Sequence, residues 1–247
     1  MKKSFRSRSL VRGVPLGCCL WLTLLSSQAL SANPSAEEIL QKADEVRNPS
    51  ESYFLRMEVV SSDTPDDPSE FEVSLQGNAK TLVKTVKPVR DRGRKMLMQE
   101  QNMWLFVPNL KRSVRVGLSQ RLVGQTANGD ISRMRWSGDY SVQMENQTAD
   151  EWVLGLKATK QGLTYDRLRI WVQKNTFHPL RAEFLTASGK VLKKAQYLDY
   201  RQLCGRVRPS RMVIADAIKQ SDQSTLKVLQ MEVKTFPSSI FYPENLK

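Results

Sequence analysis

Apolar and polar residues alternate along most of the chain after residue 50, which is the pattern of β-strands with one buried face. The first two such runs lie at Tyr53–Val60 and Phe71–Leu75. The Asp- and Pro-rich segment between them, SDTPDDPS, predicts a loop, so we expect an antiparallel pair. Further runs of the same kind lie at Thr81–Val86, Arg94–Gln99, Met103–Val107, Arg112–Val116, Tyr140–Glu145, Glu151–Thr159, Tyr165–Gln173, Leu180–Thr186, Val191–Tyr200, Arg206–Ala215 and Thr225–Phe236.

A short amphipathic helix is predicted ahead of the strands. Ser35 and Glu38 have the spacing of a capping box, in which the serine hydroxyl accepts a hydrogen bond from the amide of Glu38. Apolar residues then recur at helical spacing, and Asn48-Pro49 ends the helix. The resulting stripe, which must pack against another part of the fold, consists of Ile39, Leu40, Ala43 and Val46.

About a dozen strands with short connections predict an antiparallel sheet that closes or curls. No linker divides the chain, so we expect one domain, in which Leu118–Arg133 and Pro237–Leu246 are not strands. A curved sheet cannot fill its own concave side with its own strands. We therefore expect the helix to cover that side.

Residues 1–32 have the features of a cleavable signal peptide. The segment from Lys2 to Arg12 is basic and has no acidic residue, and the apolar run Leu16–Leu25 is too short to span a bilayer. Small residues follow, so we place cleavage near residues 29–32. The prediction is an exported protein with a single domain over residues 33–247.

Cleavage changes both the charge and the cysteine content. It removes five of the 38 Lys and Arg residues and no Asp or Glu, so the net charge of +13 falls to +8. Only Cys204 remains, which excludes an internal disulfide. The basic residues are scattered along strands and the protein is exported, which argues against nucleic acid as a partner. An anionic lipid surface, an acidic partner and ordinary solvated strand faces all stay open.

The sequence has no constellation typical of an enzyme. His178 is the single histidine and no G-x-S-x-G elbow is present. With Cys204, His178 also gives too few ligands for a zinc site, and no Gly-rich phosphate loop is present. We expect no catalytic residues, no metal and no cofactor.

Methionine and tryptophan are frequent on the predicted strands. Methionine is flexible and polarisable, and it suits surfaces that accept varied apolar shapes. Periodicity alone does not distinguish a cavity lined by these strands from a packed core. The residues that would line such a cavity are Ile39, Leu40, Val46, Tyr53, Leu55, Met57, Phe71, Val73, Leu75, Met96, Met98, Trp104, Phe106, Trp152, Leu154, Leu168 and Ile170.

One segment carries a family resemblance. Trp104–Pro108, followed by the basic strand Arg112–Val116, resembles the outer membrane lipoprotein-sorting protein family, which is related to the periplasmic lipoprotein carrier LolA and the receptor LolB. The resemblance extends over roughly residues 35–245. It includes Gly124-Gln125, Asn128-Gly129-Asp130, Gly138-Asp139-Tyr140, Phe177-His178-Pro179-Leu180 and Ser188-Gly189-Lys190.

The resemblance implies a mainly β fold in which a single curved antiparallel sheet forms an unclosed, half β-barrel. Short helices would cover its concave apolar face. It also implies a periplasmic carrier that binds acyl chains of lipoproteins or other lipids and moves them toward the outer membrane. An inner-membrane transporter of the RND or ABC type would load this carrier, an outer-membrane acceptor would unload it, and we expect it to be a monomer.

Beyond the cavity, a basic rim is the second candidate site. Lys111, Arg112, Arg115, Arg133 and Arg135 lie near the loop and are candidates to hold an anionic headgroup. The chain is longer than LolA and has an additional loop over Gln125–Asp139, so the identity of the lipid stays open. Two other functions also stay open. They are lipid or lipoprotein sensing by a regulatory protein of the RseB type, and a role as the accessory lipid-binding subunit of an RND-type transporter.

Overall fold

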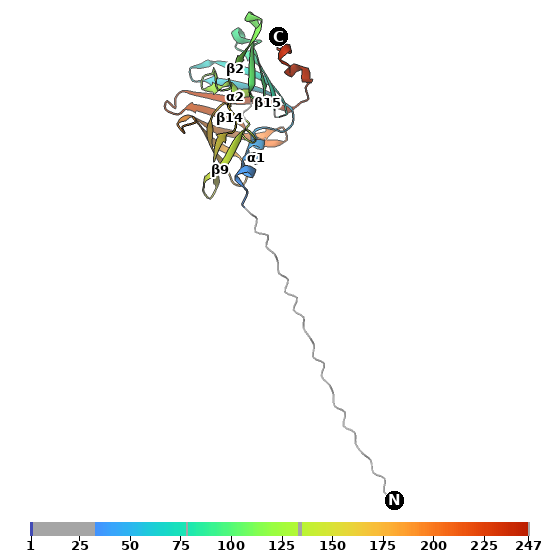
Figure 1. Cartoon of the computed structure of the whole chain (residues 1–247), viewed down its shortest axis with the longest axis vertical. Helices are drawn as coiled ribbons and strands as arrows, with labels where there is room; N and C mark the ends of the chain where they lie inside the picture. The colour runs from blue at the N-terminus through green and yellow to red at the C-terminus, as the bar shows by residue number, and fades with distance from the viewer. Residues whose placement is uncertain (2–32, 78, 133–134, 247) are drawn as a thin grey trace. The chain divides into compact units, whose positions relative to one another are not determined.

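The computed structural model describes residues 1, 33–77, 79–132 and 135–246 (Figure 1). Its folded unit is Pro34–Lys247. The predicted signal peptide lies outside the described residues except for Met1, so its cleavage and the domain boundary at residue 33 stay predictions. Within the described residues, no helix combines the length and the apolar character needed to cross a bilayer.

The folded unit is built around one antiparallel sheet. Its thirteen strands follow the order β6-β5-β4-β3-β2-β1-β15-β14-β13-β12-β11-β10-β9, so β6 and β9 are free edges and the sheet is not closed into a barrel. This confirms the predicted mainly β, unclosed architecture. The strands are β1 (Tyr53–Ser61), β2 (Thr64–Gln76), β3 (Lys80–Lys87), β4 (Lys95–Gln99), β5 (Asn102–Val107), β6 (Arg112–Val116), β9 (Tyr140–Gln147), β10 (Glu151–Ala158), β11 (Arg167–Gln173), β12 (Pro179–Leu185), β13 (Val191–Leu203), β14 (Arg206–Asp216) and β15 (Gln223–Val233).

The predicted N-terminal helix is α1 (Ala36–Arg47). The capping interaction is present, because Ser35 Oγ accepts a hydrogen bond of 3.1 Å from the Glu38 amide. The buried residues of α1 include Ile39, Leu40 and Ala43, which belong to the main hydrophobic cluster of the sheet. The helix packs against β9 and β14, as expected for an element that covers one face of a curved sheet (Figure 1).

Two segments differ from the sequence-based expectation. The Asp- and Pro-rich segment is mostly strand, because β2 starts at Thr64. Pro65 and Pro68 lie where the β1–β2 register shifts. Their missing N–H groups therefore interrupt no regular ladder of hydrogen bonds. The segment Leu118–Arg133 is not a plain loop. It contains the short hairpin β7 (Arg121–Val123) and β8 (Thr126–Ala127), followed by α2 (Asn128–Ser132). Gly129 permits α2 to lie against Thr164, with which a Cβ atom at residue 129 would collide.

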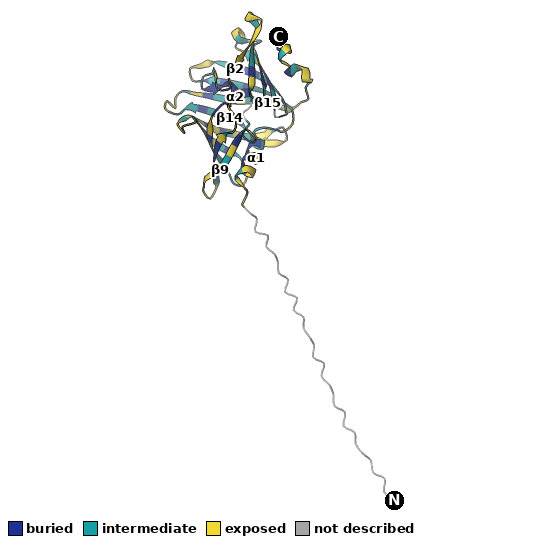
Figure 2. Cartoon of the chain, viewed as in Figure 1, coloured by how far each residue is buried: buried dark blue, intermediate teal, exposed yellow. Residues whose placement is uncertain are grey.

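The sheet has two differently covered faces. We call the face toward α1 and α2 the inner face, and its buried side chains form the main cluster. Figure 2 colours the buried residues of the strands dark blue. A second cluster joins Leu82 and Leu97 to Phe241 and Leu246. Because neighbours in sequence point to opposite faces of a strand, and Met96 and Met98 belong to the main cluster, Leu97 lies on the outer face.

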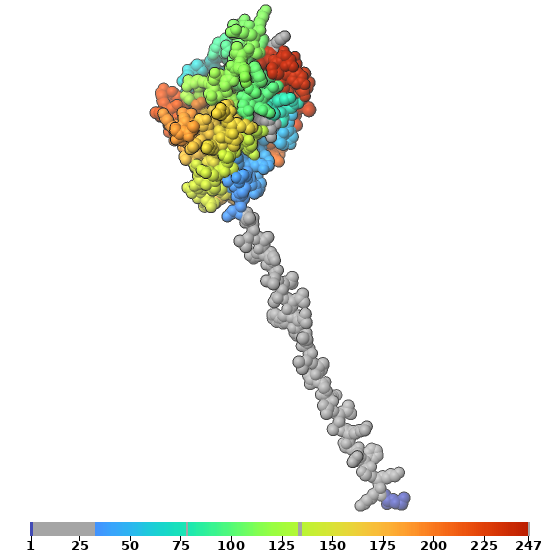
Figure 3. Space-filling model, in the orientation of Figure 1, coloured from blue at the N-terminus to red at the C-terminus, as the bar shows by residue number. Residues whose placement is uncertain are grey.

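The C-terminal tail covers part of this outer face. The tail is not strand, as predicted, and consists of the 3₁₀ turns η3 (Ser238–Phe241) and η4 (Pro243–Asn245). Gln99 Nε2 donates a hydrogen bond of 2.6 Å to the Phe241 carbonyl. Figure 3 shows the tail (red) on the surface beside the green strands. Two further 3₁₀ turns, η1 (Val89–Asp91) and η2 (Pro108–Leu110), connect neighbouring strands.

Candidate functional site

The structure gathers most of the predicted cavity residues on the inner face. Thirteen are buried members of the main cluster, and Leu55 packs against it while partly buried; Val46 is half-buried and is not among the residues of the cluster. The thirteen are Ile39, Leu40, Tyr53, Met57, Phe71, Val73, Leu75, Met96, Met98, Trp152, Leu154, Leu168 and Ile170. Whether these residues bind a lipid stays a prediction.

Trp104 and Phe106 were assigned to the wrong face. They belong to the outer cluster under the C-terminal tail. Their neighbours Met103 and Leu105 belong to or pack against the inner cluster instead. A shift of one residue in a strand exchanges the two faces, and both alternating sets of this strand are apolar.

The inner side chains pack mainly on one another and leave small cavities. A cavity of about 120 Å³, which we call the Tyr197 cavity, lies between α1, α2 and strands β1 and β13–β15. A neighbouring cavity of about 90 Å³, which we call the Leu55 cavity, shares Arg47, Met57 and Asp130 with it. A third, of about 210 Å³, lies between β2–β5 and the segment around Leu122.

The C-terminal end of α1 is held to the sheet by Arg208. This side chain is only 3% exposed and donates hydrogen bonds to the carbonyls of Glu45 (2.5 Å), Val46 (2.9 Å) and Leu203 (3.1 Å). Two of these carbonyls belong to the last turn of α1, whose carbonyl groups lack partners within the helix. Burial lowers the pKa of Arg208 from its usual value.

Asp44 fixes the same end of α1 to the segment before β9. Its carboxylate accepts hydrogen bonds from the amides of Trp136 (2.9 Å) and Ser137 (3.0 Å), and Arg47 lies 3.6 Å from it. The Arg47 guanidinium stacks over the Trp136 ring at 3.7 Å. Helix α1 is thus attached to the fold by charged groups as well as by its apolar stripe.

A set of polar side chains lies inside the apolar cluster. Tyr165 donates a hydrogen bond of 3.1 Å to Asp130, and Tyr140 donates one of 3.0 Å to the Tyr165 carbonyl. Burial raises the pKa of Asp130, opposed in part by the hydrogen bond from the Ala127 amide. Burial also raises the pKa of Tyr197. The strand pattern did not identify this network, because Tyr was counted there only as an apolar strand residue.

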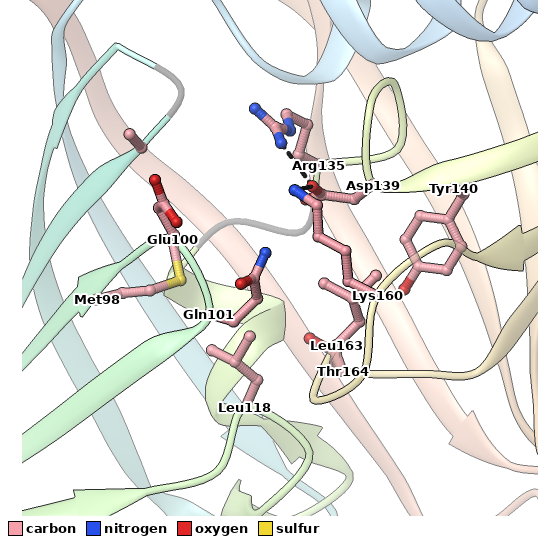
Figure 4. A pocket seen from close by; sticks show the side chains of 11 residues that line it. Met98, Glu100, Gln101, Leu118, Arg135, Asp139, Tyr140, Lys160, Leu163 and Thr164 are labelled. Carbon is pink, nitrogen blue, oxygen red and sulfur yellow. Dashed lines mark hydrogen bonds and ion pairs between the residues drawn. The ribbon is translucent and has the colours of Figure 1, made fainter.

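A more polar pocket of about 140 Å³ lies at another part of the inner side, next to Met98 and Leu118 (Figure 4). Arg135 and Lys160 converge on Asp139, at 2.5 Å and 3.6 Å respectively. Glu100 and Gln101, from the β4–β5 turn, face them across the pocket in Figure 4. The pocket therefore carries mixed charge.

The residues of the predicted basic rim lie at different places in the structure, and their role in holding a headgroup stays a prediction. Arg115 donates a hydrogen bond to Asn102 and lies over the outer-face ring of Trp104, so it belongs to the outer face. Arg115 pairs with Trp104 across the ladder, and paired residues share a face. Lys111 and Arg112 are exposed, Arg135 lines the polar pocket, and Arg133 lies outside the described residues.

No group of three or more metal-ligating side chains occurs in the part of the chain that the structure describes. His178 stacks on Tyr200 with ring centroids 4.2 Å apart, and burial lowers its pKa. What the inner face offers chemically is an apolar surface with a few hydrogen-bonding groups beneath two small helices.

Comparison with known proteins gives the family context. The family model described as "uncharacterized protein" matches residues 77–247, and no curated protein matches the chain. The crystal structure of a LolA superfamily protein from Nitrosomonas europaea is similar with a TM-score of 0.78 and 34% identity, over 85% of this chain and 99% of that one.

Two more distant structures share the fold. A domain named for outer membrane lipoprotein sorting, from Vibrio parahaemolyticus, has a TM-score of 0.71 and 20% identity, over 85% of this chain and 97% of its own. A DUF1329 family protein from Desulfovibrio piger has a TM-score of 0.71 and 16% identity, over 86% and 98% of the two chains. At these identities the similarity concerns the fold.

Proposed function

Because the chain belongs to the LolA superfamily, we propose that it is a periplasmic carrier. It binds acyl chains of lipoproteins or other lipids against the inner face of its sheet. The observation that carries the proposal is the covered inner face. A continuous apolar surface lies beneath α1 and α2, with cavities beside Leu55 and Tyr197. The proposal assigns binding and release to this protein, with no chemical reaction and no cofactor.

The binding energy is sufficient for this task. Burying an acyl chain is worth about 0.8 kcal/mol per CH₂, so a stretch of about ten carbons contributes roughly 8 kcal/mol before losses. Ordering the chain and displacing α1 consume part of that energy. The remainder corresponds to reversible binding, which suits a carrier that must also release its cargo.

Helix α1 is the element that would move. It covers the inner face with three buried apolar side chains and is attached mainly at its C-terminal end, through Arg208 and Asp44. When α1 moves away, its apolar side chains lose their contacts with the inner face of the sheet. An acyl chain bound in their place would restore apolar contacts to that face. Lipid binding and the displacement of α1 are thereby coupled. Release of the lipid favours the return of α1 to its position against the sheet.

The proposed route follows from export and from the lipid cargo. Residues 1–32 direct the protein to the periplasm, an inner-membrane transporter of the RND or ABC type loads it, and an outer-membrane acceptor receives the lipid. No nucleic acid is involved.

Co-purification tests the proposal. The full chain is expressed with its own N-terminal segment in a Gram-negative host and purified from the periplasm, and its bound lipids are extracted for mass spectrometry. A fluorescent fatty-acid probe is then titrated into the delipidated protein. We expect acyl lipids in the extract and saturable probe binding. Repeated lipid-free spectra together with no probe binding would contradict the proposal.

A further inference from the structure

The Tyr197 cavity is lined by a tyrosine whose buried hydroxyl group has no hydrogen bond to the described residues. Tyr197, on β13, is 4% exposed, and its hydroxyl oxygen has no partner among the described residues. The hydroxyls of Tyr140 and Tyr165 in the same cluster are both bonded. A buried hydroxyl without a partner costs free energy, so its retention at one of three neighbouring tyrosines points to a partner that is not part of the chain.

The surroundings of this hydroxyl indicate an amphiphilic partner. Tyr197 lines the cavity together with Arg47, Asp130 and the apolar residues Met57 and Leu226. The adjoining Leu55 cavity is lined in part by Leu55, and the two cavities share Met57. Polar side chains of the Tyr197 cavity therefore lie next to the apolar Leu55 cavity. This arrangement suits an acyl chain that carries a polar group at one end.

The charges around the cavity favour an uncharged hydrogen-bond acceptor. Arg47 has Asp44 at 3.6 Å and Arg211 has Asp199 at 2.6 Å, so neither arginine brings an uncompensated positive charge. Asp130 adds a carboxyl group to the lining. A phosphate or carboxylate would bring a charge without a matching partner into this place, which is costly. Burial raises the pKa of Tyr197, so its hydroxyl stays protonated and available as a donor at neutral pH.

We propose that the Tyr197 cavity binds the ester or amide carbonyl of an acyl lipid, with the Tyr197 hydroxyl as the hydrogen-bond donor and the chain extending into the Leu55 cavity. This assignment rests on the proposed carrier function and adds the part of the lipid that is recognised. It places the polar end of the cargo beneath α1, and not at the rim formed by Lys111 and Arg112.

Two probes of matched shape separate this proposal from the carrier function itself. Methyl 10-(1-pyrenyl)decanoate carries an ester carbonyl, and 1-dodecylpyrene is the hydrocarbon of the same chain length. Each is titrated into delipidated wild-type protein, Tyr197→Phe and the control Tyr140→Phe. Tyr197→Phe should weaken ester binding about tenfold, the equivalent of one hydrogen bond, and leave dodecylpyrene binding unchanged. Tyr140→Phe should change neither affinity, since the Tyr140 hydroxyl is already bonded within the protein.

Thermal unfolding of the ligand-free variants gives a second readout. Tyr197→Phe removes an unpaired hydroxyl, so its Tm should equal or exceed that of the wild type, while Tyr140→Phe loses a hydrogen bond and should unfold at lower temperature. Equal affinities of Tyr197→Phe and wild type for the ester would overturn the carbonyl assignment. So would an equal loss for both probes, and each of these results leaves the carrier function standing. If wild-type protein binds neither probe, the carrier function fails and the assignment fails with it.

Discussion

Arg208 offers the sharpest test of α1 as a movable cover. Its guanidinium donates to two carbonyls of the last turn of α1 and to the Leu203 carbonyl of β13. Arg208→Met keeps much of the apolar stem and removes these donors. Hydrogen bonds from a charged group contribute about 1.5–3 kcal/mol each, so loss of the two bonds to α1 should weaken its closed position by about 3 kcal/mol. That corresponds to roughly a 150-fold increase in the open fraction.

Hydrogen exchange measured by mass spectrometry reports this change directly. In Arg208→Met, the peptide that contains Ala36–Arg47 should exchange roughly 150-fold faster, while β10 and β11 keep their protection, and probe uptake should accelerate. Arg206→Met is the matched control, because Arg206 is 62% exposed and reaches Glu45 at 3.4 Å. An exposed ion pair of this kind contributes little. Unchanged exchange of α1 in Arg208→Met would refute the reasoning.

Three further predictions concern the two faces and the buried acid. Leu55→Arg places a charge in the inner cavity and should abolish probe binding in a folded variant, whereas Leu229→Arg, at a side chain that is 47% exposed, should keep it; equal binding by both would place the site elsewhere. Phe241→Ala should lower the free energy of unfolding, measured with urea, by about 3–4 kcal/mol, because Phe241 is fully buried on the outer face. Lipid affinity should not change, and a parallel loss of affinity would contradict the separation of the two faces. Because the pKa of Asp130 is raised in the folded protein, its contribution to stability is full below pH 3.8, the usual pKa of an aspartate, and is lost as the pH rises through the folded pKa. Asp130→Asn should remove this loss of stability with rising pH. Identical pH profiles of urea unfolding for the wild type and Asp130→Asn would contradict the assignment.

The strands and α1 could be predicted from the sequence because each pattern has a direct physical cause. Alternation with period 2 marks a sheet with one buried face, and the Ser35–Glu38 cap marks the start of α1. The segment Leu118–Arg133 was less predictable. Its short hairpin and the five-residue α2 are stabilised by contacts with distant residues, such as the hydrogen bond of 2.9 Å from the Gln125 amide to Ser224.

The faces of the strands were predictable only where one of the two alternating sets is polar. In β5, Met103 and Leu105 alternate with Trp104 and Phe106, and the C-terminal tail covers the second set. The covering tail lies more than a hundred residues away in sequence, so the local pattern gives no sign of it. For the same reason the local pattern did not show on which face Arg115 lies. Its neighbour on β5 is the outer-face Trp104.

The polar interior was beyond the reach of periodicity. Tyr140, Tyr165 and Tyr197 fit strand positions as apolar residues, and only the structure shows which hydroxyls are bonded. Asp130 lies in a segment that was expected to be a polar loop. Its place among buried groups follows from the contact between α2 and the 159–166 connection, which Gly129 permits.

Photo-crosslinking tests the central claim most directly, since it reports where an acyl chain lies. A lipid with a diazirine on its acyl chain is bound to the full-length protein, irradiated, and the modified peptides are identified by mass spectrometry. The account predicts modification of inner-face residues of β1, β2 and β10, among them Leu55, Leu75 and Leu154. Modification confined to the outer-face residues Trp104 and Phe106, or none above the level of an unfolded control, would contradict it.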